Sequence, residues 1–286
     1  MAQWHDAIRS IHEQHFGDPW PERLVAINQR FGLSGDNVFL THGQTVPPPW
    51  FNGDIEAVRP GDWVLMVSLN PRVIPSEVET IRWYDNQGFT AETYWAHWRR
   101  FNTNHWYWKF FRPRVRLASR LMGKSVTPNL EPLFATEQMI FVELCPYGSG
   151  SFKPSQSMVE ELATTDEGFK IAAVVRRLLI ERGKPHAIVV NGNLALGDFE
   201  ALERDRFIWD ELRYESVESL SGRSPGRMLW HRQGHYQVNA AHKIPVFGCP
   251  FLKSTKGPNS NAEIDDLADR IRAFIRSEQF SPDLAL

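Results

Sequence analysis

Four short apolar runs, each ending in a polar turn, constrain the fold of this chain most strongly. They are DWVLMVSL (62–69), QMIFVEL (138–144), HAIVVNG (186–192) and KIPVFG (243–248). Continuous apolar runs of this length are typical of strands buried on both faces. Helical patterns separate or follow them, including EGFKIAAVVRRLLIERG and a closing helix that we expect Asn261 to cap. This alternation predicts an α/β protein with three α/β/α layers around a four-stranded, mainly parallel sheet.

We expect a single domain over residues 1–286, since a chain of this length can bury a large core. Helical patterns near the start predict an N-terminal helical extension over about residues 1–58. A stretch dense in aromatic and basic side chains predicts a helical insert over about residues 76–122. The polar segment 213–243 is expected to be irregular, and a hairpin is expected between SGRSPGR (221–227) and WHRQGHYQV (230–238).

Composition excludes several classes of function. The net charge is only −2, so nucleic-acid binding would depend on a local patch. Two distant cysteines cannot form a disulfide framework or a four-thiolate metal site, and they favour the reducing cytoplasm. No signal-peptide core and no apolar run of roughly 18 residues is present, so no membrane partner is expected. Glycine-rich nucleotide motifs, a G-x-S-x-G elbow and zinc signatures are also missing, so we expect neither cofactor nor metal.

Polar side chains follow each predicted strand. They are Asn70, Glu143, Asn191 and the segment that begins at Cys249. Ligands of parallel sheets bind outside the carboxyl ends of the strands, so these groups are candidates for one site. Each has an ordinary alternative: Asn70 could be a turn residue, Glu143 could form a buried ion pair with an arginine, and Asn191 could cap a helix.

The order of these motifs along the strands resembles the uracil-DNA glycosylase superfamily. The resemblance covers about residues 60–276 and is carried by NP (70–71), ELCPY (143–147), NGN (191–193) and CPFLKSTKG (249–257). It implies that Asn70 positions or activates the attacking water and that Glu143 stands where the family has its base-reading asparagine. It also implies that Cys249 replaces the family histidine.

The resemblance further implies a base pocket and a surface that binds duplex DNA. The loop after Cys249 would enter the minor groove, with Phe251 or Leu252 as the wedge that fills the vacated stack. The pocket residues would be Pro71, Arg72, Trp83, Tyr84, Tyr147, Asn191 and Cys249. The DNA-binding residues would be Phe251, Leu252, Lys253, Ser254, Lys256, Arg223 and Arg227.

Glu143 changes which base could be read at its position. A carboxylate cannot donate to O4 of uracil, but it accepts from the N4 amino group of cytosine. A protonated carboxyl can also donate to cytosine N3, and burial at a strand end favours the protonated form. Excision of ordinary cytosine would damage the cell's own genome. The sequence therefore favours a modified cytosine, such as the glucosylated hydroxymethylcytosine that a phage-defence branch of the superfamily excises.

We therefore predict a monofunctional DNA glycosylase that flips a base from double-stranded DNA and hydrolyses its N-glycosidic bond. It would act as a cytoplasmic monomer and leave an abasic site. Cys249 is a weaker donor than histidine, which leaves open a catalytically inactive protein that binds modified bases. A glycosylase that repairs uracil or damaged bases and a hydrolase of free nucleosides or nucleotide sugars are further alternatives.

Overall fold

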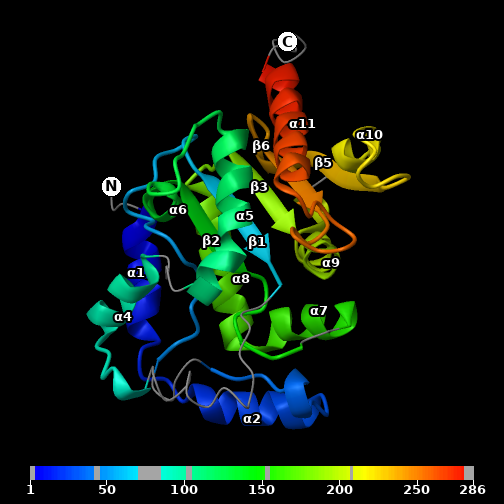
Figure 1. The fold of residues 1–286 in the computed structure, drawn as a ribbon. Helices are drawn as coiled ribbons and strands as arrows, with labels where there is room; N and C mark the ends of the chain where they lie inside the picture. The colour runs from blue at the N-terminus through cyan, green and yellow to red at the C-terminus, as the bar shows by residue number, and fades with distance from the viewer. Residues whose placement is uncertain are drawn as a thin grey trace.

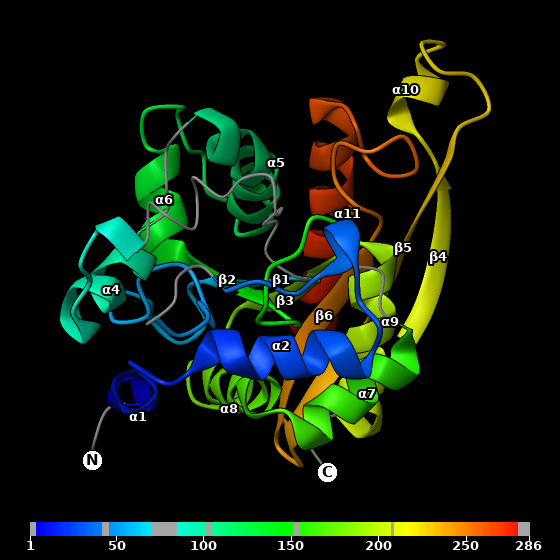
Figure 2. The same ribbon diagram turned by 90° about the horizontal axis from the view of Figure 1, so that it is seen from below.

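A six-stranded mixed sheet forms the centre of the protein, in the order β2-β1-β3-β6-β5-β4 (Figures 1 and 2). The computed structural model describes residues 4–41, 46–69, 85–100, 105–151, 155–206 and 209–279. The strands are β1 (Val64–Ser68), β2 (Met139–Glu143), β3 (Ala187–Asn191), β4 (Trp209–Glu215), β5 (Met228–Asn239) and β6 (His242–Cys249). The pairs β1–β2, β1–β3 and β3–β6 are parallel, whereas β5 is antiparallel to both β6 and β4.

The α/β class is confirmed, and the four predicted strands form the parallel part of the sheet. The prediction of a four-stranded sheet was wrong, because the segment expected to be irregular supplies β5 and the end of β4. Both strands carry many polar side chains, as in WDELRYE, where only Tyr214 is buried. Antiparallel strands at a sheet edge can leave side chains in water, so they show no continuous apolar run. The predicted hairpin between residues 221–227 and 230–238 was wrong: residues 230–238 lie in β5, which forms a hairpin with β6, and residues 221–227 form no strand.

Helices cover both faces of the sheet (Figure 1). The helices are α1 (Trp4–Gln14), α2 (Trp20–Arg30), α4 (Ala91–Trp98), α5 (His105–Leu121), α6 (Glu131–Gln138), α7 (Gln156–Thr165), α8 (Glu167–Glu181), α9 (Asn193–Leu202), α10 (Val217–Leu220) and α11 (Asn261–Gln279). Short 3₁₀ turns occupy Gly35–Asn37 and Arg204–Arg206. None of the described helices is both long enough and apolar enough to cross a bilayer.

Alternating side chains of β1 show how the strands serve both helical layers. Leu65 and Val67 pack in a core with α1, α2, α7, α8 and α9, whereas Val64 and Met66 pack in a second core with α5, α6 and α11. Both sets are fully buried. This double burial explains why the parallel strands appear in the sequence as unbroken apolar runs. The described part of the N-terminal extension belongs to the first core, through residues such as Ile8 and Trp20.

The start of α11 differs from the sequence prediction. Ser260, not Asn261, caps the helix, because its Oγ accepts from the backbone N–H of Glu263 at 3.1 Å. Glu263 in turn accepts from the backbone N–H of Ser260 at 3.3 Å, which completes a capping box. Asn261 lies one residue further along, where its Oδ1 accepts from Lys253 Nζ at 3.1 Å.

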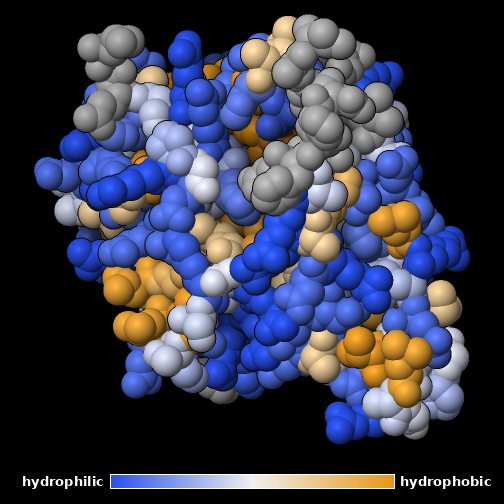
Figure 3. All heavy atoms as spheres, turned by 90° about the horizontal axis from the view of Figure 1, so that it is seen from above, coloured by the Kyte–Doolittle hydropathy of each residue, from blue (hydrophilic) through white to orange (hydrophobic). Residues whose placement is uncertain are grey.

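Strands β4 and β5, with α10 between them, form an arm over residues 209–239 that projects from the body of the protein (Figure 2). Exposed apolar side chains are found on it, including Leu212, Leu220 and Met228. Seen from above, the protein surface is mostly hydrophilic with separate hydrophobic patches (Figure 3).

A buried ion pair between α8 and the end of α9 gives the first prediction. Arg176 Nη2 lies 2.8 Å from Glu203 Oε1, both side chains are buried, and Tyr236 Oη also donates to Glu203. Arg176→Met should lower the free energy of unfolding by about 3 kcal/mol, because it leaves a carboxylate buried without its main partner. The measurement is urea denaturation at neutral pH. The control is Arg177→Met, whose side chain is half exposed and which should cost less than about 1 kcal/mol. Equal losses for the two variants would contradict the assignment.

Candidate functional site

The carboxyl ends of the four parallel strands place four polar side chains in a row. Ser68 of β1 is in register with Glu143 of β2, and Asn191 of β3 is in register with Cys249 of β6. All four side chains occupy strand positions that face the layer of α5 and α11, not the layer of α8. The sheet therefore gathers the predicted residues Glu143, Asn191 and Cys249 at one edge, as the sequence indicated.

Arg114 of α5 completes this group from the helical layer. Its side chain is almost fully buried, and its Nη2 donates to Asn191 Oδ1 at 2.6 Å. The guanidinium carbon lies 3.6 Å from the ring centroid of Phe110 and 4.8 Å from that of Phe251. A buried arginine held between aromatic faces keeps its position through both the hydrogen bond and the cation–π contacts.

The bond from Arg114 fixes the orientation of the Asn191 amide. With Oδ1 occupied by the guanidinium, Nδ2 donates to the carbonyl of Pro250 at 3.2 Å and lies 3.5 Å from Cys249 Sγ. The amide thus connects β3, the start of the loop after β6, and the aromatic insert. Its described contacts are all with protein groups, so its role in this conformation is to hold the edge of the site together.

Glu143 has an unusual environment for a carboxyl. The residue keeps part of its surface accessible, but its Oε2 is sealed from solvent and has no hydrogen-bond partner among the described residues. Burial raises the pKa of Glu143 to about 8, although the nearby charge of Arg114 acts in the opposite direction. Burial likewise lowers the pKa of Arg114 to about 9, and Glu143 partly offsets that effect. At neutral pH the carboxyl is therefore protonated and can donate a hydrogen bond, while the guanidinium remains charged.

Cys249 contributes a neutral thiol to this edge. The side chain is fully buried, and burial raises its pKa to about 11 despite the opposing effects of Asn191 and Arg114. A thiol in this state is a weak donor and a poor nucleophile. Cys249 therefore cannot supply a strong hydrogen bond to a ligand. The resemblance to the uracil-DNA glycosylase superfamily would place a histidine at this position.

Tyr147 lies away from this group. Its ring is buried on the opposite side of the sheet beside Phe39 and Phe169, and its hydroxyl donates to Asp166 Oδ1 at 2.8 Å. Gly168 packs directly against that hydroxyl, and a side chain at position 168 would clash with it. The contacts of Tyr147 are those of a core residue, although the sequence predicted it in the pocket.

The loop after β6 (residues 250–260, hereafter the strand-end loop) carries the two predicted wedge residues. Phe251 is 43% exposed and stacks near Phe110, whereas Leu252 is 1% exposed and packs against α11. In this conformation only Phe251 is available to enter a base stack. Lys253 and Lys256 of the same loop are exposed, and Ser254 is half-buried.

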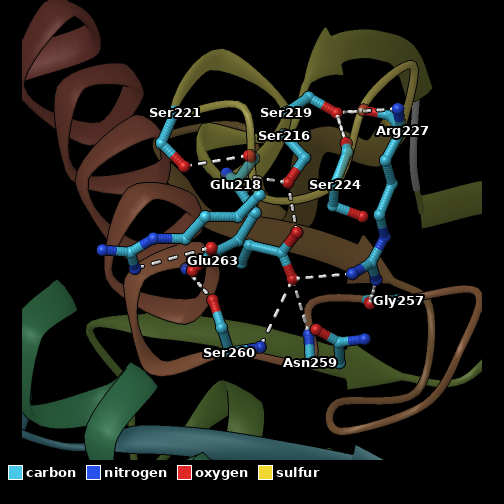
Figure 4. Close-up of polar contacts among 11 residues, drawn as sticks. Ser216, Glu218, Ser219, Ser221, Ser224, Arg227, Gly257, Asn259, Ser260 and Glu263 are labelled. Atoms are coloured by element: carbon cyan, nitrogen blue, oxygen red, sulfur yellow. Dashed lines mark hydrogen bonds and ion pairs between the residues drawn. The ribbon is translucent and has the colours of Figure 1, made fainter.

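The two predicted arginines of the arm differ sharply. Arg223 is exposed and lies 3.7 Å from Glu218, so its guanidinium remains accessible to a phosphate. Arg227 is mostly buried and turns inward to Glu263 and to the carbonyl of Gly257 (Figure 4). The donors of Arg227 that face this network are already used by protein acceptors.

Five predicted residues lie outside the described part of the chain. They are Asn70, Pro71, Arg72, Trp83 and Tyr84. Their roles stay predictions. The chain approaches Asn70 from Leu69, whose carbonyl accepts from the backbone N–H of Cys145 at 2.7 Å, two residues after Glu143.

Sequence reasoning did not identify Arg114. It recognised the aromatic and basic segment, but α5 contains several cations and their charge alone does not distinguish them. The available signal was helical phase: Arg114 falls four residues after Phe110 and three before Leu117, on the stripe that faces the core. An arginine on such a stripe is buried, and a buried arginine requires partners.

Two surface hollows, of about 410 and 460 Å³, lie elsewhere. The first runs between α5 and α11, where Arg116 pairs with Asp265 and Arg120 pairs with Asp269. The second lies among α7, α8 and α9. Neither is lined by the residues at the strand ends. We place the site at the strand ends because Arg116 and Arg120 in the first hollow are paired with carboxylates, whereas Oε2 of Glu143 has no hydrogen-bond partner among the described residues.

Within the described ranges, no group of three histidine, cysteine, aspartate or glutamate side chains could hold a metal ion. Comparisons with models of known protein families, with curated proteins and with solved structures found no match to this chain. Any function proposed for this chain therefore rests on the chemistry of the site itself.

The raised pKa of Glu143 predicts a pH-dependent stability. The unfolded chain loses this proton near pH 4.5, but the folded protein keeps it up to about pH 8. Stability should therefore fall as pH rises through that window and level off above it. Glu143→Gln removes the effect, so its advantage in melting temperature over the wild type should grow between about pH 5 and pH 8.

Differential scanning fluorimetry across this range is the measurement. Glu137→Gln, which changes an exposed glutamate on α6, is the matched control and should show no such trend. A difference between Glu143→Gln and the wild type that does not vary with pH would contradict the environment described for Glu143.

Proposed function

We propose that this protein is a monofunctional DNA glycosylase that flips a modified cytosine from duplex DNA and hydrolyses its N-glycosidic bond. The observation that carries the proposal is Glu143, a carboxyl that retains its proton at neutral pH at the carboxyl edge of a parallel sheet. The helical layers on both faces of that sheet fit the three-layer arrangement implied by the resemblance to the uracil-DNA glycosylase superfamily.

A protonated glutamate suits the recognition of a cytosine-type base. Its hydroxyl can donate to N3 while its carbonyl oxygen accepts from the N4 amino group. Uracil offers an N–H at N3 and a carbonyl at O4, and a protonated carboxyl can pair with that pattern as well. The proposed preference for cytosine therefore rests on proton transfer, because cytosine N3 can receive the proton whereas uracil N3 already carries one. A modified cytosine is proposed over an ordinary one because ordinary cytosine is a normal part of the host genome.

The same proton supports bond cleavage. Transfer from Glu143 to N3 lets the glycosidic bond break with its electron pair moving to N1 of the base, through an oxocarbenium-like sugar. Water then bonds to the anomeric carbon and releases its proton to solvent, and the Glu143 carboxylate takes up a proton from solvent, so the net reaction is a hydrolysis. Asn70 is proposed to orient that water.

Arg114 strengthens Glu143 as an acid. Its charge stabilises the carboxylate left after proton transfer, and it lowers the pKa of Glu143 relative to burial alone. Without this cation the proton would be held too tightly to be shared with a base. Arg114 and Asn191 are thus proposed to act through Glu143 and not on the base directly.

Binding to duplex DNA is proposed to use the strand-end loop and the arm. Extraction of a base costs a few kcal/mol, which an inserted aromatic side chain and phosphate contacts can offset. Phe251 is the exposed aromatic candidate, and Lys253, Lys256 and Arg223 are exposed cations. This surface predicts binding that weakens steeply with salt, unlike that of a hydrolase of free nucleosides.

A second candidate function is recognition of a modified base without catalysis. The neutral, buried thiol of Cys249 favours it, because this position provides no strong donor to the departing base. A glycosylase that repairs uracil or damaged bases remains the third reading, and it predicts release from uracil-containing DNA.

One assay separates these candidates. The protein is incubated with matched duplexes that carry uracil, cytosine, hydroxymethylcytosine or glucosylated hydroxymethylcytosine. Released bases are identified by mass spectrometry and abasic sites are scored by alkaline cleavage. Release from a modified cytosine supports the main proposal. Tight binding without release in every duplex would support the inactive reader, and release from uracil alone would support repair.

Substitutions at Glu143 test its role directly. Glu143→Gln should slow single-turnover release of a modified cytosine roughly 100-fold or more, because no proton can be transferred. Wild-type rates in Glu143→Gln would refute the mechanism. Glu143→Asn should improve processing of uracil relative to the modified cytosine.

The wild-type rate should fall as pH rises through about 8, where Glu143 loses its proton.

Asn70→Ala should remove turnover without unfolding the protein.

Arg114→Met should lower the rate of base release by about tenfold at neutral pH and move the alkaline limb of the pH profile upward, because Glu143 would hold its proton more tightly. Arg116→Met is the matched control, since Arg116 lies on the same helix but pairs on the surface with Asp265. An unchanged pH profile in Arg114→Met would show that the guanidinium does not act on Glu143.

A further inference from the structure

Glu263 of α11 is fully buried but accepts hydrogen bonds from two segments, the distant arm and the strand-end loop that leads into α11 (Figure 4). From the arm, Ser216 Oγ donates to Oε1 and Arg227 Nη1 donates to Oε2 at 3.1 Å. From the strand-end loop, the backbone N–H groups of Asn259 and Ser260 donate to Oε2 at 2.8 and 3.3 Å. Burial raises the pKa of Glu263, but these donors outweigh burial, so its pKa lies below the usual value and the side chain is a carboxylate.

Arg227 forms a second link between the same two segments. Its Nη2 donates to the carbonyl of Gly257 in the strand-end loop. Its own backbone is held within the arm, because its N–H donates to Ser219 Oγ at 2.7 Å and its carbonyl accepts from the N–H of Ser216 at 2.9 Å. The arm therefore carries a fixed guanidinium that holds the far end of the loop.

The strand-end loop is tight enough to transmit this restraint to Phe251. A side chain at Gly257 would come within 2.5 Å of the carbonyl oxygen of Phe251, so the two backbones are in direct contact. The backbone N–H of Lys253 donates to the carbonyl of Pro258 at 2.7 Å, and Lys253 has a φ of +62°. A non-glycine residue in this region is strained, and it persists only where its surroundings hold it.

We propose that Glu263 and Arg227 are positioning residues that fasten the arm to the strand-end loop and thereby set the position of Phe251. Arg227 then acts as a brace rather than as a phosphate contact, and Arg223 is the arginine of the arm that faces solvent. The brace itself follows from the contacts above. Its consequence for DNA depends on the proposed function, because Phe251 is the candidate wedge.

The arrangement is not explained by stability alone. Buried ionic groups contribute little net stability compared with apolar residues of similar size, although removal of one partner is costly. A carboxylate shared by an arm, a loop and a helix start does, however, define the relative positions of all three. The specific expectation is a local change in the loop, beyond any change in global stability.

Hydrogen exchange followed by mass spectrometry on the full-length protein tests the brace. Arg227→Met and Glu263→Gln should each speed exchange in residues 251–260 by about tenfold or more under native conditions, because local opening then costs less. Arg223→Met, on the same arm, should leave the loop unchanged. Arg227→Lys keeps a positive charge beside Glu263 but loses the second donor, which bonds the carbonyl of Gly257. It should therefore give an exchange rate between those of the wild type and Arg227→Met. Should a variant fail to fold, Ser216→Ala removes only the bond to Oε1 and should give a smaller increase in the same residues.

Loop exchange unchanged in Arg227→Met and Glu263→Gln would overturn the proposal. The consequence for DNA is tested with a duplex that carries glucosylated hydroxymethylcytosine: Arg227→Met should raise KM or Kd about tenfold and change kcat much less. An opened loop with wild-type DNA affinity would overturn the positioning role. Absence of DNA binding in the wild type would count against the proposed glycosylase, whereas the exchange experiment would still decide the brace.

Discussion

The buried guanidinium of Arg114 is the interaction on which the candidate site depends. It holds the Asn191 amide, rests between Phe110 and Phe251, and lowers the pKa of Glu143 from the still higher value that burial alone would give. One side chain from the helical layer therefore connects β2, β3 and the strand-end loop. A charge in such a position is costly to desolvate, and its described partners show how that cost is offset: the amide oxygen of Asn191, the carbonyl of Phe110 and two aromatic rings.

Much of this arrangement could be predicted from the sequence. The parallel strands were readable because burial on both faces produces unbroken apolar runs, and the edge at which they end follows from the parallel direction. Glu143, Asn191 and Cys249 therefore met as expected. Strands β4 and β5 were not readable, because a solvated antiparallel arm carries polar side chains along its length. The cap at Ser260 was missed because its neighbour Asn261 is an equally good capping residue.

The roles of individual cations were harder to predict than their presence. Arg114 is buried and Arg227 is mostly buried, and both are bonded to protein groups, whereas Arg223 is exposed. Nothing in their local sequence separates them by charge. Burial depends on helical phase for Arg114 and on a carboxylate 36 residues away in the chain for Arg227. Tyr147 shows the same limit, since it lies four residues beyond the end of β2 and its ring packs on the opposite face of the sheet from Glu143. Tertiary partners, rather than composition, decide which polar groups remain available to a ligand.

The central claim is that Glu143 holds a proton at neutral pH beside a charged arginine. Its most direct test is a carbon-13 NMR titration of the glutamate side-chain carboxyls in the intact protein, with the Glu143 signal assigned by its loss in Glu143→Gln. The account predicts that this carboxyl titrates near pH 8. Titration near 4.5, the ordinary value for a glutamate, would show a carboxylate at neutral pH and would contradict the proposed proton transfer.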